Sequence, residues 1–281
     1  MVVGFVITFR ETLEAALIIG IVLTYLHRTK NKQFIPSVWW GLAAGLVLSA
    51  TFAIGFTTLG GGFEGKSEQI FEGITFSIAV VLITTLVFWL LGHTTVRKKI
   101  EESVSKEVDR QRKIGIAALI MISVLREGVE TVIFLGAATL AAENTAELIF
   151  GIAGIVAAVA ITYAFFKGTS KLPLKTFFTA TTIILILFAA GMAAAAIHEF
   201  QEAKILPGEG SKAWDINPRQ TPDGIYPPLH DKGIVGSMLK GLLGYNGSPS
   251  WLEVFGYFGY LVFTGGTWLH YKKKRYVEKI L

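Results

Sequence analysis

Seven long apolar segments, separated by polar connections, constrain this chain more than any other feature. Each is close to the length of about 20 residues that an α-helix needs to cross the hydrocarbon core of a bilayer. Only 17% of the 281 residues are charged, against roughly a quarter in soluble proteins. We therefore expect an all-α integral membrane protein, and we exclude a soluble domain, a disordered chain and a nucleic-acid-binding protein. The predicted transmembrane helices are 2–26, 38–59, 70–92, 114–141, 147–166, 176–197 and 251–271.

The basic residues indicate how these helices are oriented. Most of the 26 lysines and arginines lie in the first, third and fifth connections and in the C-terminal tail. Because basic loops stay in the cytoplasm, we expect the N-terminus outside and the C-terminus inside. The opposite side is acidic, which indicates either solvated loop carboxylates or a negative vestibule that concentrates cations. These outer acidic residues are Glu64, Glu68, Glu72, Glu143, Glu147, Glu199 and Glu202.

The first and fourth apolar segments repeat each other. The sequence Arg-Glu-Thr-Leu-Glu at 10–14 matches Arg-Glu-Gly-Val-Glu at 126–130 with an offset of 116, and Gly20 matches Gly136 with the same offset. Each unit has three helices, so the second unit enters the membrane from the other side, as in the inverted repeats of many transporters. The predicted organisation is a first three-helix repeat (1–92), a cytoplasmic connection (93–113), a second three-helix repeat (114–197), an extracytoplasmic loop (198–250) and a seventh helix with a basic cytoplasmic tail (251–281).

The repeated motif places charged residues near the middle of two membrane helices. A charge at that depth costs at least about 2.5–3.5 kcal/mol, so such residues face the bundle interior and mark a pathway. Glutamates three residues apart share one helix face, and the arginine lies four residues before the second glutamate. We predict one midplane centre in which the carboxylates bind a metal ion and the arginines support them; the alternative is an Arg–Glu network that locks the helices together without a ligand. The metal-binding candidates are Glu11, Glu14, Glu127 and Glu130, and the supporting residues are Arg10 and Arg126.

The donor atoms limit which metal this centre can bind. The chain contains no cysteine, which excludes thiolate zinc sites, iron–sulfur clusters and covalently attached haem. Carboxylate oxygens suit hard cations such as magnesium, calcium, manganese and iron, of which ferric iron is the hardest. Four carboxylates with two arginines carry a formal charge of −2, and bound cations or protons relieve their repulsion. We expect no permanent cofactor.

Three further residues are candidate entry ligands on the outer side. Glu72 begins the third segment, where it is either an entry ligand or an interfacial carboxylate. His198 and Glu199 end the sixth segment, where they either pass metal inward or cap the helix. The segment from His198 to Glu202 lacks the second histidine of a zinc-protease helix. Neither motif contains the Glu-x-x-His pair of di-iron carboxylate enzymes. We therefore predict no catalytic residues and a transporter rather than an enzyme.

The paired motifs at 10–14 and 126–130 resemble the signature of the oxidase-dependent iron transporter family, the iron permeases of fungi and bacteria. Three other segments are similar to the bacterial branch: 71–73 (Phe-Glu-Gly), 198–203 and 244–250. The resemblance covers the whole chain. It implies iron uptake across the plasma membrane beside a separate extracytoplasmic oxidase or peroxidase, with the four motif glutamates as the iron ligands.

We predict that the protein imports iron, in the ferric form, after oxidation by a separate protein. Its expected partners are the iron ion, the lipid bilayer and an extracytoplasmic oxidase, peroxidase or iron-binding protein, but no nucleic acid. The small residues of 41–45 could serve packing within the chain or a homo-oligomer. The alternatives are a transporter of another metal cation such as lead or manganese, and a membrane ferroxidase or metal sensor.

Overall fold

The computed structural model describes residues 2–92, 96–142, 146–167, 174–208, 210–218, 226–231 and 233–278. These residues form helices and one isolated antiparallel bridge between Lys212 and Ser250, which confirms the expected all-α class. The elements are α1 (Val2–Arg28), the short 3-10 helix η1 (Lys32–Phe34), α2 (Ile35–Gly60), α3 (Lys66–Gly92), α4 (Val96–Asp109), α5 (Lys113–Ala142), α6 (Ala146–Phe166), α7 (Leu174–Glu202), α8 (Ile234–Leu243) and α9 (Trp251–Glu278).

Four helical stretches are long and apolar enough to cross a membrane. They lie in α2 with η1, in α3, in α6 and in α7. The helices α1, α5 and α9 coincide with the other three predicted spans, but α1 and α5 carry the charged motifs. The total of seven spans, the two repeats and the orientation therefore stay predictions. The four stretches are Lys32–Gly60, Lys66–Phe88, Glu147–Phe166 and Thr179–Glu202.

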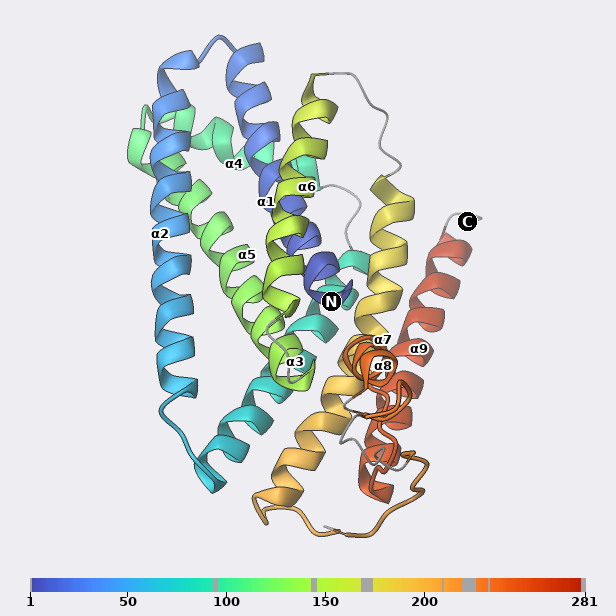
Figure 1. Ribbon diagram of the computed structural model, residues 1–281. Helices are drawn as coiled ribbons and strands as arrows, with labels where there is room; N and C mark the ends of the chain where they lie inside the picture. Colours follow the sequence, from blue (N-terminus) through green and yellow to red (C-terminus); the bar gives the residue numbers. More distant parts are fainter. Residues whose placement is uncertain are drawn as a thin grey trace.

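The long helices pack side by side in a small number of pairs. α1 packs along α6, α2 packs along α5, and α1 also contacts α5. α3 packs along α7, which in turn contacts α9. Figure 1 shows α2 and α9 at opposite sides of the bundle, and α1 and α5 running in opposite directions. The two motif helices are thus in contact and antiparallel.

Glycines form the closest of these helix contacts. A β-carbon on Gly45 of α2 would lie 2.8 Å from the side chain of Val124 on α5. Gly154 of α6 lies directly against the backbone of Phe5 and Phe9 on α1. Small residues let helix backbones approach closely in lipid, where apolar burial gives no driving force for association. The pairs α2–α5 and α1–α6 are therefore stabilised by close van der Waals packing of complementary helix surfaces.

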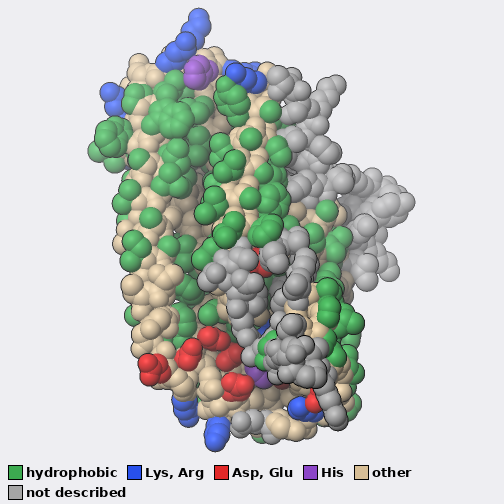
Figure 2. Space-filling model, in the orientation of Figure 1, with side chains coloured by type: hydrophobic (Ala, Val, Ile, Leu, Met, Phe, Trp, Pro, Cys, Tyr) green, Lys and Arg blue, Asp and Glu red, His purple; other side chains and the backbone are tan. Residues whose placement is uncertain are grey.

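Large apolar side chains point outward from α2. Trp40 is 74% exposed, and Val47 and Ile54 are each 65% exposed, whereas Gly41, Gly45 and other small residues are buried. In Figure 2, hydrophobic side chains cover most of the middle of the visible face, and charged side chains gather mainly toward its two ends. This distribution is typical of a surface that contacts lipid between two aqueous phases.

The segment 93–113 contains a helix that the sequence analysis treats only as a connection. Val104 and Val108 of α4 are buried in a cluster with Ile116 of α5 and Leu26 of α1. Together with Ile100 they recur every four residues, which is the period of an amphipathic helix. The many charged residues of this segment hid that apolar stripe. α4 therefore covers one end of the bundle, where α1 ends and α5 begins.

Backbone hydrogen bonds order the described part of 198–250. The Ala213 N–H donates to the Pro249 carbonyl at 2.8 Å, and the Ile216 N–H donates to the Gly247 carbonyl at 2.8 Å. α8 ends at Gly244, whose φ of +69° is a left-handed conformation that glycine adopts without strain. α8 packs on α7 and also contacts α5 and α1. Its C-cap Gly244 lies against Gly191, eleven residues before the end of α7, so this part of the segment lies beside α7.

Gly154→Ala should lower the free energy of unfolding by about 1–3 kcal/mol, because the added methyl group meets backbone atoms that cannot move aside. Gly55→Ala is the matched control, since a β-carbon at Gly55 has no atom within 4 Å. Thermal unfolding of the purified protein in detergent compares the two variants. Equal melting temperatures would contradict close packing of α1 on α6.

Candidate metal centre

The first half of the centre is a fully buried arginine on α1 held between two glutamates of the same helix. The Arg10 side chain is 0% exposed. Its Nη1 lies 2.6 Å from Glu11 Oε1, and its Nη2 lies 2.5 Å from Glu14 Oε1. The positive charge of the guanidinium therefore partly neutralises both buried carboxylates.

The second half, on α5, is arranged differently although its three charged residues match those of the first. Arg126 Nε donates to Glu130 Oε1 at 2.9 Å, and the Arg126 side chain is 52% exposed. Glu127 and Glu130 are both buried. Arg126 thus neutralises Glu130, whereas Glu127 forms no ion pair with the residues that the structure describes. The two halves of the centre differ in their electrostatics.

Three carboxylates from the two helices lie together. One ligand oxygen each from Glu11, Glu14 and Glu127 falls within 4.8 Å of the other two. This is the only group of at least three potential metal ligands that meets this criterion within the described ranges. Glu130 belongs to the same buried region but forms an ion pair with Arg126. The structure thus brings three of the four predicted ligands together and leaves the fourth beside them.

Several of these carboxylate oxygens lack a hydrogen-bond partner. Oε2 of Glu11, Glu127 and Glu130 is buried and accepts no hydrogen bond from any residue that the structure describes. A buried polar atom left unpaired costs about 1–3 kcal/mol, and more if it is charged. Three such oxygens in one buried region are explained if a cation occupies it, because metal coordination satisfies acceptors without hydrogen-bond donors. The chemistry of the donor set fits a hard cation.

A large cavity leads away from the centre toward the end of α1. It has a volume of about 940 Å³ and lies among α1, α2, α5 and α6. Glu11 and Glu127 line one part of it, and His27 and Arg28 line another. We call it the central cavity. Its wall is mainly apolar, with hydroxyl groups from residues such as Ser49 and Thr162. It offers a continuous space between the carboxylates and the basic end of the bundle.

A second, acidic pocket lies toward the opposite end of the bundle. It has a volume of about 530 Å³, and α3, α7, α8 and the start of α9 contribute to its wall. The structure brings the predicted entry ligands Glu72, His198 and Glu199 together in this pocket. None of the motif residues lines it, as far as the described residues show. The other ionisable residues of its wall are Glu68, Glu202, His230, Asp231, Lys240 and Glu253.

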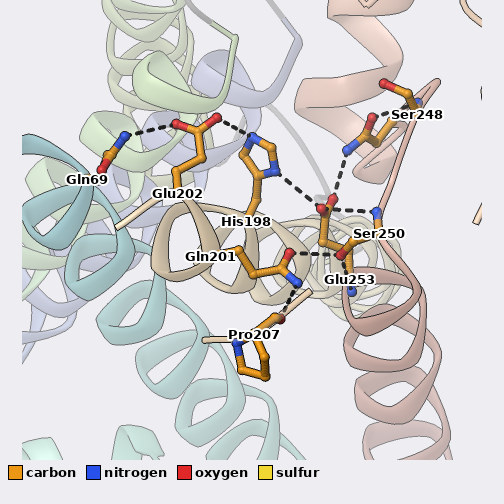
Figure 3. A network of polar contacts seen from close by, with 9 residues as sticks. Gln69, His198, Gln201, Glu202, Pro207, Ser248, Ser250 and Glu253 are labelled. Atoms are coloured by element: carbon orange, nitrogen blue, oxygen red, sulfur yellow. Dashed lines mark hydrogen bonds and ion pairs between the residues drawn. The ribbon is translucent and has the colours of Figure 1, made fainter. Parts of the chain in front are cut away.

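His198 is held between carboxylates from two helices (Figure 3). Its Nδ1 lies 3.2 Å from Glu253 Oε1, and its Nε2 lies 3.2 Å from Glu202 Oε1. Glu202 also accepts a hydrogen bond from Gln69 of α3 at 3.1 Å. The contacts join α3, α7 and α9 at the wall of the acidic pocket. Both ring nitrogens of His198 are therefore engaged in this structure.

Comparison with protein families identifies what kind of protein carries this centre. The model of the iron permease FTR1 family matches residues 1–271. The chain belongs to this iron permease family. It is 34% identical to the "Ferrous iron permease EfeU" of Yersinia pestis over 265 residues, which are 93% of this chain and 91% of the relative. It is also 34% identical to the protein of the same name from Escherichia coli O6:K15:H31, with 93% of each chain covered. No solved structure matches it.

The protein is thus a multi-pass membrane protein of an iron permease family, and the predicted resemblance is confirmed. Permeases are transporters, which agrees with the prediction that it is not an enzyme. Iron is the substrate of its named relatives.

Two buried acidic residues of this permease accept hydrogen bonds that the sequence did not predict. Glu253 is 3% exposed and accepts hydrogen bonds from Asn246 and from the Ser250 N–H. The spacing Ser-x-x-Glu at 250–253 is a helix capping box, a signal that could have identified it. Glu147, noted only as an outer acidic residue, accepts a hydrogen bond from the Gly4 N–H at 2.7 Å. It therefore ties the start of α1 to the start of α6.

Glu253→Ala should destabilise the permease by about 1–3 kcal/mol, because His198, Asn246 and the Ser250 N–H all lose their buried acceptor. Glu202→Ala is the control, since the Glu202 side chain is 45% exposed and water can replace it. Melting temperatures in detergent distinguish them. A smaller loss for Glu253→Ala than for Glu202→Ala would contradict the role of Glu253 as the centre of this network.

Proposed function

We propose that the protein imports iron across the plasma membrane through a midplane site formed by the glutamates of α1 and α5. The observation that carries this proposal is the meeting of Glu11, Glu14 and Glu127 within 4.8 Å, with buried oxygens that lack hydrogen-bond donors. Membership of the iron permease family supports iron as the substrate. Glu130 is the fourth ligand in this proposal and reaches the ion when it leaves Arg126.

Charge balance supports a cation rather than an empty network. The four carboxylates and the two arginines sum to a formal charge of −2. Two positive charges of an iron ion would neutralise this sum and relieve the repulsion between the glutamates. The alternative is an Arg–Glu network that locks the helices together without a ligand. In such a network we expect each carboxylate to be neutralised by an arginine and no buried oxygen to be left without a partner.

The helix contacts support two inverted repeats, 1–92 and 114–197. Exchanging α1, α2 and α3 with α5, α6 and α7 converts the pair α1–α6 into α5–α2 and leaves α3–α7 unchanged. Gly45 of α2 faces Met121 and Val124, and Gly154 of α6 faces Phe5 and Thr8, which lie 116 positions earlier. In inverted repeats, the substrate binds near the midplane where the repeats meet. Rocking of one repeat against the other would then alternate access.

The path in this proposal runs from the acidic pocket, on the outside, to the central cavity, on the inside. Glu72 and Glu199 are the entry ligands, and the surrounding acidic residues concentrate cations. His198 remains a candidate ligand, but its two carboxylate contacts support a role in holding the wall of the pocket. The loop 198–250 is extracytoplasmic, the connection 93–113 is cytoplasmic, and the seventh helix with its tail (251–281) ends inside.

Two observations favour different oxidation states of the iron. Carboxylate oxygens favour ferric iron, the harder ion, supplied by a separate extracytoplasmic oxidase or peroxidase. The relatives are named ferrous iron permeases, which favours the ferrous form. Other metal cations such as lead or manganese suit the same donors, and a ferroxidase or sensor would bind iron without net flux.

Glu14→Gln and Glu130→Gln should each reduce iron uptake at least about tenfold, since each removes a negative charge of the site with little change of shape; tenfold corresponds to about 1.4 kcal/mol. Uptake of radioactive iron into proteoliposomes measures this, with ferrous and chelated ferric iron supplied in turn. The control is Glu102→Gln, an exposed carboxylate on α4.

Uptake by both motif variants at the rate of the wild type would overturn the glutamate site. Transport of one oxidation state alone would identify the substrate. Saturable uptake of lead or manganese with which iron does not compete would support the alternative substrates. Iron binding or oxidation without flux would support the ferroxidase or sensor.

Iron uptake should slow several-fold when the proton gradient across the proteoliposome membrane is collapsed. As the cation leaves, protons can replace it on the repelling carboxylates, which couples the return of the site to the gradient. The measurement compares initial rates with and without a protonophore. An unchanged rate would exclude this coupling while leaving the glutamate site intact.

A further inference from the structure

An aromatic ring lies against α1 beyond the carboxylates. Phe166, the last residue of α6, packs its ring on the bare backbone of Gly20, where a β-carbon would overlap the ring. Both residues line the central cavity, and Phe166 is 41% exposed. The only other ring recorded against Phe166 among the described residues is that of its neighbour Phe165, in an edge contact at 5.3 Å. Phe166 thus borders the cavity on the side that leads away from the centre.

A second ring lies against α5 in the corresponding position. Phe56 of α2 packs on Gly136, where a β-carbon would lie 2.7 Å from the ring. Its ring also contacts Phe71 of α3 at 5.4 Å and Phe52 at 6.5 Å. Phe63 extends this cluster, with its ring centroid 5.4 Å from that of Phe71. Phe56 is therefore partly buried beside two further rings that belong to α2 and α3.

The two ring–glycine contacts are equivalent in the repeats. Gly20 and Gly136 each follow the second glutamate of their motif by six residues, which is about 9 Å along a helix. Phe56 and Phe166 differ by 110 positions, one more than the 109 that separate the equivalent glycines Gly45 and Gly154, so the correspondence rests on the shared ring–glycine contact. α1 and α5 run in opposite directions (Figure 1). Gly20 and Gly136, with the rings that pack on them, therefore lie on opposite sides of the carboxylate level.

We propose that Phe166 and Phe56 are the inner and outer gates of the iron path, each seated on the glycine of a motif helix. This inference rests on the transport function proposed above and adds the residues that open and close the path. A phenyl ring offers a hydrated ion no ligand, so a constriction lined by rings blocks ions by excluding water. Glycine lets the ring reach the helix backbone and leave it without displacing a side chain.

The unequal surroundings of the two rings assign the state of this structure. Both rings rest on their glycines, and the space beside them differs. The outer ring, Phe56, packs against Phe71 and Phe52. The inner ring, Phe166, forms part of the wall of a cavity of about 940 Å³ that continues past it, from Glu11 and Glu127 to His27 and Arg28. The structure is accordingly open toward the inside, and exchange of the two arrangements between the repeats would open it toward the outside.

Thiol labelling tests the outer gate without any need for iron flux. The chain has no cysteine, so Thr131→Cys, in the wall of the central cavity one turn beyond Glu127, is a single reporter. A membrane-impermeant methanethiosulfonate should label it from the inner side and at least about tenfold more slowly from the outer side. Adding Phe56→Ala should raise the outer rate about tenfold, whereas Phe52→Ala and Phe166→Ala should not.

An outer labelling rate unchanged by Phe56→Ala would overturn the proposal, as would an equal rise with Phe52→Ala. Because this readout does not depend on the substrate, the gates can be supported even if the protein carries no iron. Conversely, iron uptake by the wild type with no effect of Phe56→Ala on labelling would reject the gates alone.

Cross-linking tests both gates during transport. The pairs Gly20→Cys with Phe166→Cys and Gly136→Cys with Phe56→Cys are joined by a short bifunctional thiol reagent that a reductant cleaves. If the contacts open and close in each cycle, cross-linking should reduce iron uptake at least about tenfold, and reduction should restore it. The control pair is Gly256→Cys with Ile197→Cys, a contact of α9 with α7 outside both motif helices, which should keep its uptake when cross-linked.

If a variant with one cross-linked gate pair takes up iron at the rate before cross-linking, that ring–glycine contact is static, and the proposal for that ring is overturned. Failure of both gate pairs to cross-link would remove the contacts on which it depends. If the cysteine pairs carry no iron before cross-linking, the labelling rates of Thr131→Cys decide.

Discussion

Burial of charge between α1 and α5 is the constraint on which the structure depends. Arg10 and Glu11 are buried, Glu14 is 15% exposed and pairs with Arg10, and two more glutamates come from the facing helix. In a bilayer such groups are tolerated only where they neutralise one another or hold a ligand. The two motif helices must therefore stay in contact, and the other helices must shield them from lipid. The glycine contacts of α2 on α5 and of α6 on α1 provide that shield at short distance.

The same constraint separates the functions of the remaining helices. α3, α7 and α9 carry no motif, and their polar residues meet at the acidic pocket instead. There Glu253 is buried but accepts several hydrogen bonds, whereas the motif glutamates keep oxygens without donors. A buried carboxylate whose oxygens accept hydrogen bonds stabilises the wall of the pocket. A buried carboxylate with oxygens that lack donors attracts a cation. This difference separates the structural acidic residues of the permease from those proposed to bind iron.

Much of the helical framework was predictable because it follows from local sequence. Every predicted span coincides with a long helix, and the charged motifs lie near the middle of α1 and α5 as expected. The helix α4 was missed because its charge obscured the spacing of Val104 and Val108. The position of His198 between two carboxylates could not be predicted, since Glu253 lies 55 residues away and is brought near only by the packing of α9.

The sequence by itself determined the all-α membrane class, the duplicated motif and the family, because apolar length and the types of donor atom are properties of the chain. The tertiary structure alone decided how two motifs with the same charged residues differ: Arg10 is buried between two carboxylates, and Arg126 is half exposed and pairs with one. The reason is that local sequence repeats exactly the same charges, while burial depends on which helices pack around each copy. Three carboxylates therefore meet on one side of the centre, and Glu130 stays beside them.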